Sequence, residues 1–260
     1  MRASRFTVLA AVVILVGAVA CLGPWQATRP ATVLIALSKL AGLIGAVLAS
    51  FRVVAGFGND EPQRRPWLVL AVALACTTVG QSVLAYHQVV LDVRAPFPSP
   101  GDPFFVVGAL LIVWAMVAFA RAASSSGLPL GTPLQFWSPA LAVLALLAIT
   151  AYPVLHPVLE APATPVARIL NVFYPAASFV TLAPLAVMQR VGLRFRGGSL
   201  LRVWVPLTVG FAAVLVSDVL FAYFSTLSMT SLDGALDFLY LLGYWTIPAG
   251  ALGQADVLAA

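Results

Sequence analysis

The sequence predicts an all-α, polytopic membrane protein with eight transmembrane helices, and three observations support this prediction. Of the 260 residues, 62% are hydrophobic and only 9% are charged, whereas a soluble domain carries about 25% charged residues. Apolar stretches reach the length of about 20 residues that a helix needs to cross the hydrocarbon core of a bilayer. Polar and proline-containing breaks separate these stretches. This composition excludes a water-soluble enzyme, a nucleic-acid-binding domain and a disordered chain.

Eight apolar stretches predict eight spans, which together form one integral membrane domain over residues 1–260. The first three breaks lie at 26–30, 59–62 and 98–102, where proline accompanies polar residues. The fifth and sixth spans have the least distinct ends. The expected spans are 7–25, 31–56, 67–89, 103–121, 138–156, 167–189, 201–224 and 235–255.

The arginine residues predict the orientation of the chain. Ten lie at one set of helix ends and loops and three at the opposite set. Because basic residues favour the cytoplasmic side, we expect both termini in the cytoplasm. The arginines are scattered among loops, so we expect the lipid bilayer as a partner and no nucleic acid. The ten are Arg2, Arg5, Arg52, Arg64, Arg65, Arg121, Arg190, Arg194, Arg196 and Arg202, and the three are Arg29, Arg94 and Arg168.

The first span allows a second interpretation. Arg2 and Arg5 before an apolar run resemble the start of a signal peptide, and residues 18–21 resemble a lipoprotein cleavage site. Cleavage would leave seven spans and a lipidated Cys21. We favour an ordinary first transmembrane helix, because short spans that end near tryptophan are common in membrane proteins. Cys21 and Cys76 both lie in apolar stretches, so we expect buried free thiols and no metal site.

The chain also shows signs of an internal repeat of four spans plus four, over residues 1–122 and 138–256. An even number of spans in each copy makes the two copies parallel, related by an axis along the membrane normal. The alternative is chance similarity between apolar helices. The segments that align without a gap are 80–86 with 217–223, and 102–108 with 237–243.

Two segments of this repeat resemble a known family. Residues 97–105 are similar to an outer loop with the pattern PSxxD followed by aromatic and small residues, and Asp218 with residues 237–244 is similar to its second half. The family is the multi-span N-terminal membrane sensory region of bacterial, especially actinobacterial, diguanylate cyclases and phosphodiesterases (GGDEF/EAL proteins). The resemblance covers residues 67–122 and 201–255. It implies a sensory module in a bacterial inner (plasma) membrane.

The sequence departs from the family at three points. Gln81 stands in the first copy where Asp218 stands in the second, and Gly101 replaces a less flexible residue. The sequence to Ala260 contains no cyclase or phosphodiesterase domain, so we expect a sensory region that is either standalone or truncated. The resemblance therefore implies the sensory region without its output domain.

Two charged residues inside the expected spans require an explanation. A charge near the bilayer centre costs about 2.5–3.5 kcal/mol on insertion scales, so it is a functional candidate by default. From the helical rise, Lys39 lies about 12 Å and Asp218 about 9 Å below the outer surface. An ion pair between them is expected if their helices are neighbours. Otherwise Lys39 extends outward to water and Asp218 pairs locally.

Other polar residues cluster in the same outer half and predict a polar pocket that opens to the outside. Tyrosine and histidine also occur ordinarily at the membrane interface, which is the alternative for several of them. Asp102 before Pro103 is expected to cap a helix. The pocket candidates are Lys39, Gln81, Tyr86, His87, Asn171, Asp218, Tyr223, Asp237 and Tyr240.

Cofactors and catalysis receive little support from the sequence. His87 and His156 could in principle bind haem from two helices, but neither belongs to a haem motif. Lys39 lacks the aromatic neighbours expected around a retinal lysine. No HExxH or GxSxG motif is present, so we expect no catalytic residue, no metal and no enzymatic activity.

The sequence thus favours a sensory or interaction module that binds a molecule in the outer half of the bilayer. Such a module relays binding to a cytoplasmic signalling protein. A small-molecule transporter and a structural subunit of a larger membrane complex remain as alternatives. The polar pocket supports either of the first two functions, whereas a structural subunit does not need it.

Overall fold

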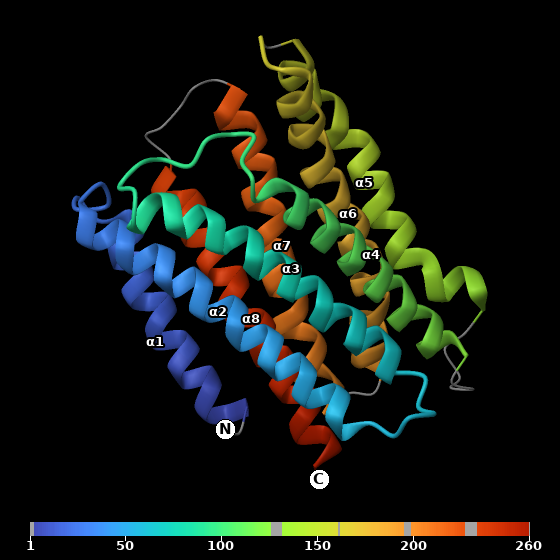
Figure 1. Ribbon diagram of the computed structural model, residues 1–260. Coiled ribbons are helices and arrows are strands. Elements are labelled where there is room, and N and C mark those ends of the chain that lie inside the picture. Colours follow the sequence, from blue (N-terminus) through green and yellow to red (C-terminus); the bar gives the residue numbers. More distant parts are fainter. Residues whose placement is uncertain (1–2, 126–131, 161, 195–198, 227–232, 260) are drawn as a thin grey trace.

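The computed structural model describes residues 3–125, 132–160, 162–194, 199–226 and 233–259. Eight helices and no strand occur within these ranges, which confirms the predicted all-α fold (Figure 1). The helices are α1 Ala3–Leu22, α2 Arg29–Gly56, α3 Arg64–Val89, α4 Asp102–Ser124, α5 Pro133–Glu160, α6 Pro165–Arg194, α7 Leu200–Thr226 and α8 Asp233–Leu258.

Seven of the eight helices are long and apolar enough to cross a membrane, which confirms a polytopic membrane protein. For α5, the fully described residues include a shorter apolar stretch, Pro133–Ile149. Prolines lie inside α6, α7 and α8. A helix in a membrane tolerates such prolines because neighbouring helices and local adjustments satisfy the backbone groups that are released.

Six helices pack in a ring, and the other two lie outside it. Going around the ring, α2 packs on α3, α3 on α4, α4 on α6, α6 on α7, α7 on α8, and α8 again on α2. Helix α1 lies outside against α8 and α2, and α5 lies outside against α6 and α7. Figure 1 shows α1 and α5 on opposite flanks of the bundle, and the two termini at the same end. We call this end the terminal end and the opposite one the distal end.

A layer of aromatic rings fills the interior near the terminal end. Trp67, Phe119 and Trp204 form this aromatic layer, with Phe119 in edge-to-face contact with both tryptophans at centroid distances of 5.2 Å. All three side chains are buried, and Phe119 has no exposed surface. They come from α3, α4 and α7, so the layer ties three ring helices together and closes the bundle on this side.

Four residues that the predicted repeat aligns in pairs lie in the same part of the structure. Its alignment pairs Gln81 with Asp218 and Asp102 with Asp237. All four residues line the interior of the ring toward its distal end. The common origin of the two halves remains a prediction.

Candidate functional site

The six ring helices enclose a cavity of about 1090 Å³. Its lining begins at the distal end with the loop between α3 and α4 and the first turn of α8. The cavity ends near the middle of the helices, where its lining consists of apolar side chains. These deepest residues are Leu43, Leu74, Ile112, Phe211 and Ile247. The cavity therefore occupies the distal half of the bundle, and the aromatic layer lies beyond its floor.

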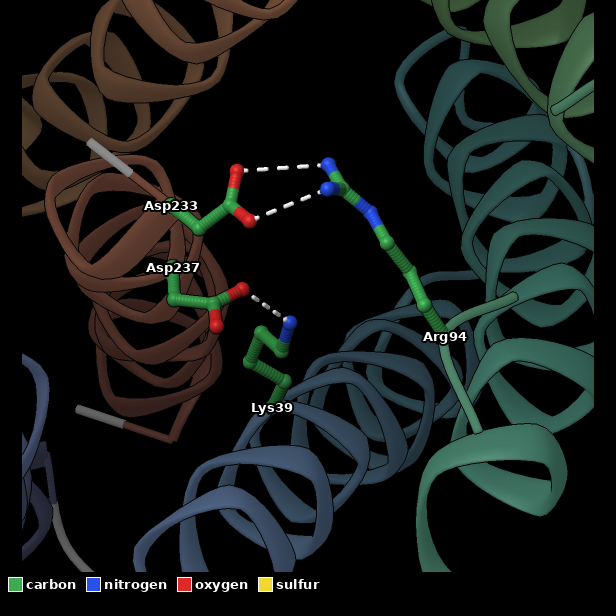
Figure 2. Close-up of polar contacts among 4 residues, drawn as sticks. All are labelled: Lys39, Arg94, Asp233 and Asp237. Atoms are coloured by element: carbon green, nitrogen blue, oxygen red, sulfur yellow. Dashed lines mark hydrogen bonds and ion pairs between the residues drawn. The ribbon is translucent and has the colours of Figure 1, made fainter. Parts of the chain in front are cut away.

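An ion pair between α2 and α8 lies in the cavity wall (Figure 2). The Nζ atom of Lys39 is 2.7 Å from Oδ1 of Asp237, which makes this contact both a salt bridge and a hydrogen bond. The Lys39 side chain is 6% exposed and that of Asp237 is 32% exposed. A lysine this deeply buried needs a counter-charge, because removing a charge from water without a partner is costly.

Lys39 therefore does not pair with Asp218, and the prediction of that ion pair is wrong. Helix α2 packs against α8, and α8 in turn packs against α7, so α8 lies between Lys39 and Asp218 in the ring. Asp218 is instead held by two neutral donors. The Ser178 hydroxyl donates to Oδ2 at 2.5 Å, and the Tyr240 hydroxyl donates to Oδ1 at 2.8 Å.

A second ion pair lies at the distal mouth of the cavity. Arg94, on the loop between α3 and α4, contacts both carboxylate oxygens of Asp233 at 3.3 Å (Figure 2). These side chains are 62% and 42% exposed, so water weakens their attraction. The same loop is fixed to α7 by an edge-to-face contact between Phe97 and Phe221. The loop thus forms one wall of the mouth.

Asp102 is the first residue of α4 and Gly101 holds the N-cap position without a side-chain capping bond, so the expected capping role of Asp102 is wrong. The Oδ2 atom of Asp102 accepts a hydrogen bond from the Ser99 backbone N–H, and the Ser99 side chain accepts one from the Gly101 N–H. These bonds hold the turn of residues 99–102 that precedes α4, but they do not form a capping box, in which the Ser99 side chain would accept from the Asp102 N–H. The second oxygen of Asp102 accepts from the Tyr174 hydroxyl on α6 at 2.5 Å. Asp102 therefore both holds the turn before α4 and lines the cavity.

The described lining has two glutamines with incomplete hydrogen bonding, Gln88 at its amide oxygen and, more deeply buried, Gln81. Gln81 is 3% exposed and lies on the cavity wall. Its amide nitrogen Nε2 has no hydrogen-bond partner among the residues that the structure describes. Buried polar groups in folded proteins nearly always have a partner. Gln81 therefore contributes to the cavity wall a buried donor that has no acceptor among the described residues.

Five of the nine predicted pocket residues line the cavity: Lys39, Gln81, Asp218, Asp237 and Tyr240. Helical geometry explains two of the others. Tyr86 follows Gln81 by five positions, and Tyr223 follows Asp218 by five, which turns each tyrosine about 140° away from the cavity. Both tyrosines are exposed on the outside of the bundle.

The remaining two predicted residues form hydrogen bonds within or between helices, although the Oδ1 atom of Asn171 has no partner among the described residues. The Nδ1 atom of His87 lies 2.9 Å from the Val83 carbonyl of its own helix. Asn171 is buried and donates from Nδ2 to the Ser225 hydroxyl of α7 at 3.3 Å. Neither belongs to the cavity lining.

Several cavity residues were not predicted, although the sequence contains a signal for them. Residues three or four positions apart share one face of a helix, and polar residues at this spacing mark stripes on three helices. The stripes that line the cavity are Thr77, Gln81 and Gln88 on α3, then Tyr174, Ser178 and Thr181 on α6, and Asp233, Asp237, Tyr240 and Tyr244 on α8.

The two histidines lie on helices with different neighbours. His87 is on α3, which packs on α2 and α4, whereas His156 is on α5, which packs on α6 and α7. His156 contacts Glu160 of its own helix at 3.3 Å. In the described part of the chain, no group of three or more His, Cys, Asp or Glu side chains is placed to hold a metal ion.

Comparisons with protein-family models, with curated proteins and with solved structures find no match for this chain. Its class therefore follows from its fold and cavity alone. It is a polytopic helical membrane protein whose ring of six helices encloses a cavity lined by both polar and apolar side chains toward the distal end.

Proposed function

We propose that the protein is a membrane receptor module that binds a small polar molecule in its cavity and relays binding to a cytoplasmic partner. The proposal places the terminal end in the cytoplasm, which the arginine distribution supports, and the protein in a bacterial inner membrane, which the family resemblance supports. The observation that carries the proposal is the one-sided cavity. Polar side chains line the cavity toward the distal end of the bundle. The aromatic layer lies on the terminal side of the apolar residues that form the cavity floor.

The buried charges favour a ligand-binding function over a purely structural one. Lys39, Asp218 and Asp237 all lie within membrane-spanning helices and face one cavity. Charged side chains at membrane depth are costly and usually mark a binding site or pathway. A subunit that serves only as a scaffold gains nothing from them.

Helix α8 is the element best placed to relay binding. At the cavity it carries Asp237, and near its other end Asp256 accepts a hydrogen bond from the Ala3 backbone N–H at 2.8 Å. Between these points the Trp245 indole donates to the Ser38 carbonyl of α2 at 2.9 Å. A ligand that changes the Lys39–Asp237 contact would thus act on a helix that reaches the terminal end. The resemblance to sensory regions of diguanylate cyclases and phosphodiesterases supports the same function.

A transporter is the second candidate. Residues equivalent in the predicted repeat, Gln81 with Asp218 and Asp102 with Asp237, line one cavity. Repeat interfaces are where substrate sites of many transporters lie. Transport would require an alternate state in which the aromatic layer opens.

The test is to purify the protein in mild detergent and measure its thermal unfolding with a set of small cationic, anionic and neutral polar compounds. A receptor is stabilised by some of them, because a ligand that binds the native state raises the unfolding temperature. It also shows no flux of those compounds in proteoliposomes, whereas a transporter does. A protein partner that copurifies in fixed stoichiometry, with no ligand response, would instead indicate a structural subunit.

A matched pair of variants connects the response to the cavity. Asp218→Asn alters the cavity wall, whereas Tyr223→Phe alters an exposed residue five positions along the same helix. Loss of the ligand response in Asp218→Asn alone supports the proposal. Equal responses of both variants and the wild type contradict it.

A further inference from the structure

We infer that the ligand of the cavity is a small organic ammonium ion that also carries a hydrogen-bond acceptor. Asp218 and Asp102 provide the negative charge that attracts it, and Gln81 donates to its acceptor. This inference rests on the proposed receptor function and specifies the chemical class of the ligand. It follows from the charges of the lining, the aromatic walls and the unpartnered amide.

The charges that line the cavity do not balance. Its carboxylates are Asp92, Asp102, Asp218, Asp233 and Asp237, and its cationic side chains are Lys39 and Arg94. Lys39 pairs with Asp237, Arg94 with Asp233, and Asp92 with Arg29 just outside the lining. Within the described residues, no cationic side chain forms a salt bridge with Asp102 or Asp218. The cavity thus has two carboxylates without a counter-charge.

The hydrogen bonds around these carboxylates suit their ionised form. Both oxygens of Asp218 accept hydrogen bonds, from Ser178 and Tyr240. Both oxygens of Asp102 do the same, from Ser99 and Tyr174. An ionised carboxylate can accept hydrogen bonds at both oxygens, and this arrangement provides a donor for each of them. Neutral donors orient these groups without cancelling their charge, so a cation in the cavity is attracted to both.

The walls of the cavity favour an organic cation over a metal ion. Aromatic rings from four helices and the α3–α4 loop line it, and the electron-rich face of such a ring attracts ammonium groups. Metal ions instead need several oxygen, nitrogen or sulfur ligands arranged around one point. The described residues contain no such group of acidic, histidine or cysteine side chains. The aromatic residues of the lining are Phe97, Phe105, Phe211, Phe221, Phe224, Tyr174, Tyr240 and Tyr244.

Gln81 provides an independent indication of a ligand and refines its chemistry. The residue is 3% exposed, lines the cavity and has an amide nitrogen without a partner in the described structure. Leaving a buried donor unpaired is unfavourable, so a ligand acceptor in the cavity would restore the missing bond. A hydroxyl, carbonyl or carboxylate oxygen on the ligand would serve. The cavity volume of about 1090 Å³ is ample for a small ligand.

The experiment compares three probe compounds on the purified full chain. Choline combines a quaternary ammonium with a hydroxyl group, 3,3-dimethyl-1-butanol is its uncharged isostere, and tetramethylammonium lacks the acceptor. Binding is measured by isothermal titration calorimetry in detergent at constant pH and ionic strength. We expect choline to bind, tetramethylammonium to bind more weakly, and the uncharged isostere to show no measurable binding. Equal binding of choline and the isostere would overturn the inference without any variant.

Variants then locate the contacts. We expect Asp218→Asn and Asp102→Asn each to weaken choline binding about tenfold, since contacts to charged groups are stronger than neutral ones. Gln81→Leu should reduce the advantage of choline over tetramethylammonium while leaving tetramethylammonium binding unchanged. Asp60→Asn is the matched control, because Asp60 lies in the exposed loop before α3 at the terminal end. Undiminished choline binding in both Asp218→Asn and Asp102→Asn, with each variant folded, would overturn the assignment.

The outcome separates this inference from the function on which it rests. If neutral or anionic compounds stabilise the protein and the cationic probes do not, the receptor function stands and the ammonium inference is wrong. If no class of compound binds, both are wrong.

Discussion

The Nζ atom of Lys39 lies 2.7 Å from Oδ1 of Asp237, and the two residues are 198 positions apart in the sequence. This contact joins α2 to α8 at the point where the ring of six helices closes. The Trp245 indole reinforces the same seam through its hydrogen bond to the Ser38 carbonyl. The α2–α8 interface therefore both closes the ring and contributes charged side chains to the cavity wall.

Removing one partner of this pair should destabilise the protein more than removing both. In Lys39→Met, Asp237 loses its counter-charge within the membrane-spanning bundle. We expect a loss on the order of 2–3 kcal/mol, below the usual 3–5 for a buried pair because Asp237 is partly exposed. Thermal or denaturant unfolding in detergent, followed by tryptophan fluorescence, measures the effect.

Two further variants serve as controls for this prediction. Lys39→Met combined with Asp237→Leu removes both charges and should recover part of the lost stability. Arg94→Gln breaks the exposed pair with Asp233 and should cost less than about 1 kcal/mol. A double variant less stable than Lys39→Met alone would contradict the prediction.

Helices α7 and α8 cross so closely that one added methyl group should separate them. A Cβ atom at Gly243 would lie 2.8 Å from Cγ2 of Val214 and 2.9 Å from the Gly210 carbonyl oxygen. The backbone oxygen cannot rotate away as a side chain can. We expect Gly243→Ala to reduce stability by about 1–3 kcal/mol, as measured by unfolding in detergent.

Gly45 in α2 is the matched control for Gly243. A Cβ atom there would meet no atom within 4 Å. Because alanine is a better helix former than glycine, Gly45→Ala should be neutral or stabilise the protein by up to about 1 kcal/mol. Similar losses in the two variants would show that close approach of α7 and α8 is not the cause.

The aromatic layer should matter for stability but not for recognition in the cavity. Phe119→Ala removes the ring that contacts both Trp67 and Trp204. We expect a loss of about 3–5 kcal/mol, as for other buried phenylalanines. Phe104→Ala, on the same helix but 42% exposed, should cost much less. Ligand affinity of the folded Phe119→Ala protein should match that of the wild type, and a loss of binding would place the layer within the site.

Cysteine labelling on intact cells tests the proposed orientation. Val93→Cys and Asp60→Cys introduce exposed thiols at the distal and terminal ends, in a background where Cys21 and Cys76 are replaced by alanine. A membrane-impermeant maleimide should label position 93 directly and position 60 only after permeabilisation, because the basic residues favour a cytoplasmic terminal end. The reverse pattern would place the termini outside the cell.

The class of protein and the positions of its helices follow from local properties of the sequence. A stretch of about 20 apolar residues has few alternatives to a membrane helix, and breaks such as residues 59–62 mark the ends. Polar residues three or four positions apart on α3, α6 and α8 also mark the faces that line the cavity. These signals need no knowledge of neighbouring helices.

The partners of the charged residues depend on tertiary packing. Lys39 and Asp218 have similar depths, and depth alone suggested that they pair. Which helices touch is decided by how the side chains of all six ring helices fit together, and in this packing α8 lies between α2 and α7. Asp237 therefore faces Lys39, and Asp218 turns to the neutral hydroxyls of Ser178 and Tyr240. Rotation about the helix axis likewise separates Gln81 in the cavity from Tyr86 outside it, because five residues are not a whole number of turns.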